Sequence, residues 1–146
     1  MITAYFMAPV RGSAGDSVSD SKKADNVKKG IEIGQTLRGH FPNLDIHVPH
    51  EHEDIIDKIW RKLKTIGFAN CGRFIVECCC EIAIEKDMGI AYIGDGISEG
   101  MSLEMKVMAD SGIPVIEVEE INDNAITDIS ALMTQVADAK KRRSGY

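Results

Sequence analysis

Two short loops hold the residues of this sequence that are best suited to chemistry on an anionic ligand. The first, APVRGSAGD at residues 8–16, and the second, GDGISEG at residues 94–100, each follow an apolar run. In the first loop Gly12 permits close approach of a ligand, and the Arg11 guanidinium is a forked cationic donor. These features suit a phosphate group, although the sequence has neither a P-loop nor the glycine pattern of dinucleotide-binding folds.

The second loop ends where a helix is expected to begin. Ser98 and Gly100 fall at this helix N-terminus, which favours an anion or a sugar hydroxyl. Glu104 follows six residues after Ser98, in the first turns of the helix, where its carboxylate could face the same crevice. The simpler interpretations are that Glu104 complements the helix dipole and that Arg11 is a solvent-exposed turn residue.

The apolar pattern predicts the elements that position these loops. Short apolar runs predict strands over residues 2–10, 44–48, 89–93 and 114–118. Helical spacing predicts helices over residues 21–40, 55–63, 74–86, 102–111 and 125–141, with a loop at 49–53. This alternation predicts one α/β domain over residues 1–146, an open, mostly parallel sheet with helices on both faces, as in Rossmann- or flavodoxin-like three-layer sandwiches. Ligands of such folds bind beyond the carboxyl ends of the strands, where both loops lie.

Composition narrows the class of protein. The chain has 146 residues, of which 44% are hydrophobic and 27% charged, and its net charge is −6. The acidic balance argues against general binding to nucleic acid or to anionic membranes. No run approaches the roughly 20 apolar residues that span a bilayer. The apolar start lacks the basic segment and cleavage site of a signal peptide, so we expect a cytoplasmic protein.

Neither the cysteines nor the histidines predict a metal centre. Three of the four cysteines, Cys78, Cys79 and Cys80, are consecutive, and on a helix neighbours point about 100° apart. We interpret the cysteines as small buried side chains in a reducing compartment. The segment HVPHEHED at residues 47–54 allows a metal site, but a solvated polar edge is the simpler interpretation. We therefore expect no metal and no cofactor.

Together, the two loops resemble those of the nucleoside 2-deoxyribosyltransferase-like superfamily, and most nearly its nucleoside 5′-monophosphate N-glycosidase branch. The first family motif is an aromatic residue, a small residue and an Arg-Gly turn. In this sequence it is matched by Tyr5, Ala8, Val10, Arg11 and Gly12. The resemblance marks all five as site residues, with the last four binding substrate.

The second family motif is Ser-x-Gly-x-x-x-Glu followed by a helix and an apolar strand. Ser98, Gly100 and Glu104 match it, and MADSGIPVIEV continues as the family pattern does. The resemblance extends over most of the chain, but its specific part is confined to the two loops.

The resemblance implies a mechanism. Glu104 would attack the anomeric carbon of a nucleotide sugar and form a glycosyl-enzyme, which water or a second base would resolve. Tyr5 would orient the carboxylate. Serine at position 98, where the transferase branch has an acidic residue, favours a 5′-monophosphate. The implied reaction is hydrolysis of the N-glycosidic bond, releasing a free base and a sugar 5-phosphate.

One position departs from the family pattern. The family's aspartate, which helps to protonate the leaving base, falls near Cys79, between Glu77 and Glu81. We favour Glu81 as its replacement. Asp95 in the second loop is a candidate sugar contact, although a turn aspartate more commonly has a structural role. In the family, the region that corresponds to residues 47–54 frames the base.

Two other functions stay open. One is a nucleoside 2-deoxyribosyltransferase that exchanges bases, and the other is a non-catalytic module that binds or senses nucleotides. The cysteine run favours the sensing module, whereas Glu104 with Tyr5 favours an enzyme and Ser98 favours a hydrolase. In each case the partner is a small nucleotide or nucleoside. Relatives associate, which implies a homodimer or larger homo-oligomer, with an apolar helix face around Met105 as the contact.

Overall fold

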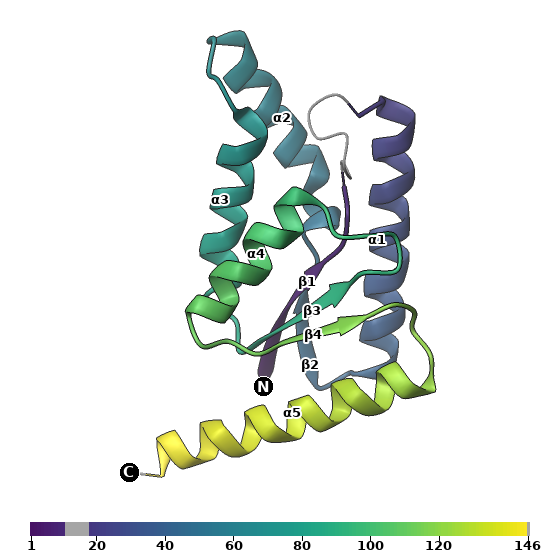
Figure 1. The fold of residues 1–146 in the computed structure, drawn as a ribbon, viewed down its shortest axis with the longest axis vertical. Helices are drawn as coiled ribbons and strands as arrows, with labels where there is room; N and C mark the ends of the chain where they lie inside the picture. Colours follow the sequence, from purple (N-terminus) through teal and green to yellow (C-terminus); the bar gives the residue numbers. More distant parts are fainter. Residues whose placement is uncertain (11–17, 146) are drawn as a thin grey trace.

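The computed structural model describes residues 1–10 and 18–145 as an α/β fold around a four-stranded parallel sheet (Figure 1). The strands are β1 (Ile2–Met7), β2 (Leu44–His47), β3 (Met88–Tyr92) and β4 (Val115–Val118), in the order β2-β1-β3-β4. The predicted open parallel sheet is confirmed. The first strand ends three residues earlier than predicted, because Pro9 has no N–H to continue the ladder.

The connections between strands are helical. They are α1 (Asp20–His40), η2 (Pro49–His52), α2 (Glu53–Thr65), α3 (Cys71–Ala83), α4 (Glu99–Asp110) and, after β4, α5 (Asp123–Ser144). The predicted loop at 49–53 was wrong, because a short 3₁₀ helix leads directly into α2. Helix α3 ends at Ala83, before the predicted end at Lys86. Asp87, which follows, contacts β1, where its carboxylate accepts a hydrogen bond from the Thr3 N–H at 2.9 Å.

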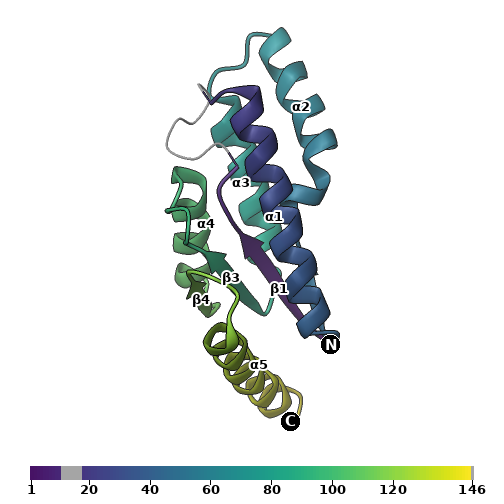
Figure 2. The same cartoon turned by 90° about the vertical axis from the view of Figure 1, so that its right-hand side faces the viewer.

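Helices cover both faces of the sheet, as the sequence predicts (Figures 1 and 2). One face packs on α1 and α5 through a core that includes Phe6, Leu37, Ile90 and Ile129. The other packs on α3 and α4 through a second core: Tyr5, Met7, Ala83, Ala91, Met101 and Met108. Successive residues of β1 therefore point alternately into the two cores, as the pleat of a strand requires.

The α2–α3 pair rises beyond the carboxyl end of β1, on the side where α1 begins (Figure 1). Ser19 caps the N-terminus of α1, and Ser98 caps that of α4, because each serine hydroxyl accepts a hydrogen bond from an N–H in the first turn of its helix. Within residues 1–10 and 18–145, no helix combines the length and the apolar character needed to cross a bilayer.

Candidate functional site

A cavity of about 340 Å³ opens at the carboxyl end of β1, in the volume range of small-molecule sites. Its floor is formed by the end of β1, and its walls by α3, the start of α4, η2 and the start of α2. The topology therefore brings together segments that are up to a hundred residues apart in the sequence.

Tyr5 and Glu104 meet inside this cavity. The Tyr5 hydroxyl on β1 donates a hydrogen bond to Glu104 Oε2 on α4. Burial raises the pKa of Glu104 to about 7, and the hydrogen bond from Tyr5 acts in the opposite direction. Burial, and then the charge of Glu104, raise the pKa of Tyr5, so the phenol stays protonated and remains a donor. The carboxylate is thus oriented and is ionised only near neutral pH or above.

Cys79 is the α3 side chain that faces this pair. It lines the cavity, and its thiol interacts with the Tyr5 hydroxyl. Burial, followed by the charge of Glu104, raises the pKa of Cys79 to about 11. The thiol is therefore neutral at physiological pH, and it lies near the position at which the family resemblance implies an aspartate.

The two glutamates beside Cys79 point elsewhere. Glu81, which the sequence analysis favoured as the acid, is exposed and does not line the cavity. Glu77 is exposed and pairs with Arg73 at 3.2 Å. The helical period explains this arrangement, because a side chain two positions along an α-helix points about 200° away from its neighbour. Orienting Cys79 inward turns Glu81 outward.

The N-terminus of α4 forms another part of the wall. Ser98 and Gly100 both line the cavity, and Ser98 Oγ accepts from the Met101 N–H at 3.2 Å. The first N–H groups of a helix have no acceptor within it. The N–H groups of Glu99 and Gly100 therefore have no acceptor within the helix, and the Ser98 hydroxyl, which accepts from Met101, can still donate its own proton.

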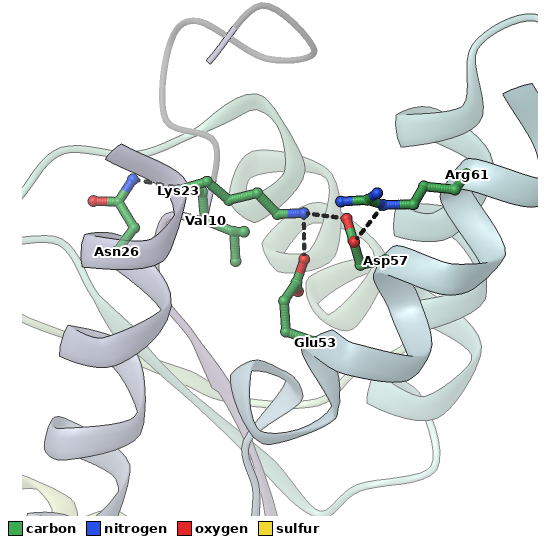
Figure 3. A network of polar contacts seen from close by, with 6 residues as sticks. All are labelled: Val10, Lys23, Asn26, Glu53, Asp57 and Arg61. Atoms are coloured by element: carbon green, nitrogen blue, oxygen red, sulfur yellow. Dashed lines mark hydrogen bonds and ion pairs between the residues drawn. The ribbon is translucent and has the colours of Figure 1, made fainter. Parts of the chain in front are cut away.

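The first loop is described only in part. Ala8 and Val10 line the cavity, and the Val10 carbonyl accepts from Asn26 Nδ2 of α1 at 2.7 Å (Figure 3). The predicted substrate-binding residues Arg11 and Gly12 lie outside the described residues. Among residues 1–10 and 18–145, Arg73 is the arginine that lines the cavity, and the sequence analysis did not single it out.

Asp95 lies apart from this cavity. Its carboxylate pairs with Lys29 of α1 at 2.6 Å, and it lines a separate hollow beside Tyr92. The structure therefore does not bring Asp95 together with Tyr5 and Glu104.

The histidines of residues 47–54 lie in two different environments. His47 stacks on Tyr5 with ring centroids 5.6 Å apart, and His52 stacks on His47 at 5.2 Å. His50 instead turns toward α1, lines the cavity and is only 2% exposed. In the described part of the chain, no group of three His, Cys, Asp or Glu side chains could hold a metal ion.

Glu53, the first residue of α2, was also missed as a site residue. It lines the cavity, and its Oε1 lies 2.7 Å from Lys23 Nζ of α1. Lys23 also pairs with Asp57 at 3.0 Å, and Asp57 with Arg61 at 2.8 Å (Figure 3). The polar segment HVPHEHED was the available signal for Glu53 and His50, but the sequence does not show which of its side chains face a cavity.

Comparison of the chain with protein-family models, with curated protein sequences and with solved structures gives no match. A parallel α/β fold accommodates many unrelated reactions, so the fold does not determine the function. Function is therefore inferred from the geometry of the cavity.

Proposed function

We propose that this protein hydrolyses the N-glycosidic bond of a ribo- or deoxyribonucleoside 5′-monophosphate. The observation that supports this proposal most strongly is the Tyr5–Glu104 hydrogen bond in a cavity shared with the start of α4. Gly100 and Glu104 are four residues apart, on one face of the helix and about 6 Å along its axis. A sugar could therefore place its 5′-phosphate at the helix N-terminus and its anomeric carbon beside the carboxylate.

The proposed reaction has two steps. The Glu104 carboxylate attacks C1′, forming a C–O bond, while the C1′–N bond breaks and its electron pair leaves with the base, which takes a proton from water. Water then attacks C1′ and loses a proton, and the C–O bond to Glu104 breaks, returning its electron pair to the carboxylate. The sum is nucleotide plus water giving base plus sugar 5-phosphate. Tyr5 orients the nucleophile throughout.

Phosphate binding in this proposal uses the N–H groups of Glu99 and Gly100 and the hydroxyl of Ser98. The contribution of Arg11 and Gly12 stays a prediction. No cofactor is required, because the carboxylate supplies the nucleophile and water completes the reaction. Four free cysteines suit a reducing compartment, and we propose the cytoplasm.

A second candidate is a module that binds nucleotides without turning them over. Cys79 favours it, because a thiol with a pKa of about 11 is a poor acid for a leaving base. Base exchange by a deoxyribosyltransferase differs from hydrolysis only in the acceptor that resolves the glycosyl-enzyme. One experiment separates all three functions.

That experiment incubates the protein with a panel of ribo- and deoxyribonucleoside 5′-monophosphates and measures free base and sugar phosphate. We expect base release that Glu104→Ala abolishes. Glu81→Ala is the control, because Glu81 is exposed and does not line the cavity. Release that requires an added base would indicate the transferase, and binding without release would indicate the sensing module. Release that survives Glu104→Ala would overturn the proposed mechanism.

A further inference from the structure

The wall formed by η2 and the start of α2 carries a hydrogen-bond acceptor, the carboxylate of Glu53, which an ion pair holds in place. Glu53 lines the cavity, and its Oε1 is paired with Lys23, both side chains being 15% exposed (Figure 3). The ion pair holds the carboxylate at Oε1, a buried oxygen that makes no hydrogen bond of normal geometry with residues 1–10 or 18–145. Among the described residues, no hydrogen bond or ion pair involves its other oxygen. A carboxylate is an acceptor without donors, so a ligand at this wall must offer it an N–H or O–H group.

His50 adds an unpaired group to the same wall. The ring is buried, yet neither nitrogen makes a hydrogen bond of normal geometry with residues 1–10 or 18–145, although the Pro9 and Ala8 carbonyls lie beside it. The Phe6 ring lies 5.9 Å away, and Gly30 of α1 packs directly on the imidazole. A buried polar group without a partner is costly, and a bound ligand is one explanation of such a group.

The base of a nucleotide suits the wall that His50 and Glu53 form. If the proposed function holds, the sugar lies beside Glu104 and the phosphate at the start of α4, which leaves the base for Pro49, His50, Glu53 and Ile56. Cytosine and adenine carry an exocyclic amino group, at C4 and at C6, which donates to a carboxylate. Uracil and thymine carry a carbonyl oxygen at C4, and guanine carries one at C6, which a carboxylate repels.

We infer that the wall formed by His50 and Glu53 selects nucleotides whose base is cytosine or adenine, with an amino group at C4 or at C6. Glu53 accepts from that amino group, and His50 makes a second hydrogen bond to the edge of the base. CMP and UMP are the matched pair of probes, because they differ at the amino-or-carbonyl position. We expect CMP to bind at least about tenfold more tightly than UMP, the cost of one unpaired buried group.

The test measures, by calorimetry, the dissociation constants of CMP and UMP and of their deoxyribo forms. These titrations use the Glu104→Gln variant, because the loss of the nucleophile prevents turnover. It also measures base release by the wild-type protein. Glu53→Gln replaces a pure acceptor with a group that can also donate, so we expect the CMP-to-UMP preference to fall by about tenfold or to invert. Asp57→Asn is the control, because Asp57 pairs with the same Lys23 but does not line the cavity.

The outcomes are distinct. Equal affinities for CMP and UMP, or a preference that Glu53→Gln leaves unchanged, overturn the inference even if nucleotides are hydrolysed. A preference that falls equally in Asp57→Asn also overturns it, because the ion pair and not the acceptor would then be responsible. Preferential binding without base release supports the inference and overturns only the hydrolysis. If no nucleotide binds, both fail.

Discussion

At the scale of single residues, Glu104 meets two opposing requirements. The proposed attack on C1′ needs an ionised carboxylate, whereas burial in the cavity favours the protonated form and raises the pKa of Glu104 to about 7. The hydrogen bond from Tyr5 offsets part of this effect. The side chain is therefore expected to cost stability at the pH at which it is reactive, as functional residues often do.

The burial of Glu104 predicts that the difference in stability between the wild-type protein and the Glu104→Gln variant depends on pH. Glu104 is protonated in both states below its ordinary pKa of 4.5, and between that value and about 7 only the folded state keeps the proton. The contribution of Glu104 to the free energy of unfolding therefore falls as pH rises through this range. The fall is about 3 kcal/mol, because each pKa unit corresponds to roughly 1.4 kcal/mol. Glu104→Gln has no such loss, so its stability relative to wild type should rise by about 3 kcal/mol from pH 4 to pH 8.

Urea denaturation at both pH values measures this difference. Glu99→Gln is the control, because Glu99 is exposed and no hydrogen bond or ion pair of its side chain is found among the described residues. A Glu104→Gln variant whose stability relative to wild type is the same at pH 4 and pH 8 would contradict the burial of the carboxylate.

At the scale of elements, two glycines set how closely α1 lies on η2 and the end of β2. A Cβ added at Gly30 would lie 2.4 Å from His50 Cδ2, and one at Gly34 would lie 2.7 Å from Val48 Cγ2. The two are one helical turn apart, so they form one groove along α1 that receives His50 and Val48. The place of the buried imidazole is thus determined by the packing of a different helix.

Gly30→Ala should therefore destabilise the protein and displace His50. We expect a loss of about 1–3 kcal/mol in the free energy of unfolding, as for other overpacked positions, together with weaker nucleotide binding. Gly39→Ala in the same helix has no atom within 4 Å of its added Cβ. It should be neutral or stabilising by up to about 1 kcal/mol. Equal unfolding free energies for the two variants would show that the His50 contact is not tight.

At the scale of the whole molecule, α2 presents an apolar face to solvent. No residue of α2 is fully buried, and Ile55 and Ile59, which share one side of the helix, are 61 and 45% exposed. Ile66, directly after the helix, is 73% exposed. Met105, around which the sequence predicts a subunit contact, is half-buried and packs against the core between the sheet and helices α3 and α4. We propose that a second copy of this chain covers the α2 face, as the resemblance implies for a homodimer or larger oligomer.

Ile59→Lys tests this association. A charge in the proposed interface should shift the mass measured by light scattering from oligomer to monomer, or weaken association at least about tenfold. Ile97→Lys is the control, because Ile97 is 52% exposed but lies in the loop between β3 and α4. A monomeric wild-type protein, or an oligomer that Ile59→Lys leaves intact, would contradict the proposal.

The succession of strands and helices along the chain, and the start of a helix a few residues before Glu104, could be predicted from the sequence. Both depend on apolar periodicity and helix capping, which are local properties. Three features required the tertiary structure. Tyr5 and Glu104 meet across 99 residues because the sheet order places β1 beside β3, which leads into α4. Cys79 and not Glu81 faces the cavity because packing sets the rotation of α3. His50 is buried because a glycine of α1 leaves room for its ring, a contact between segments that sequence periodicity does not encode.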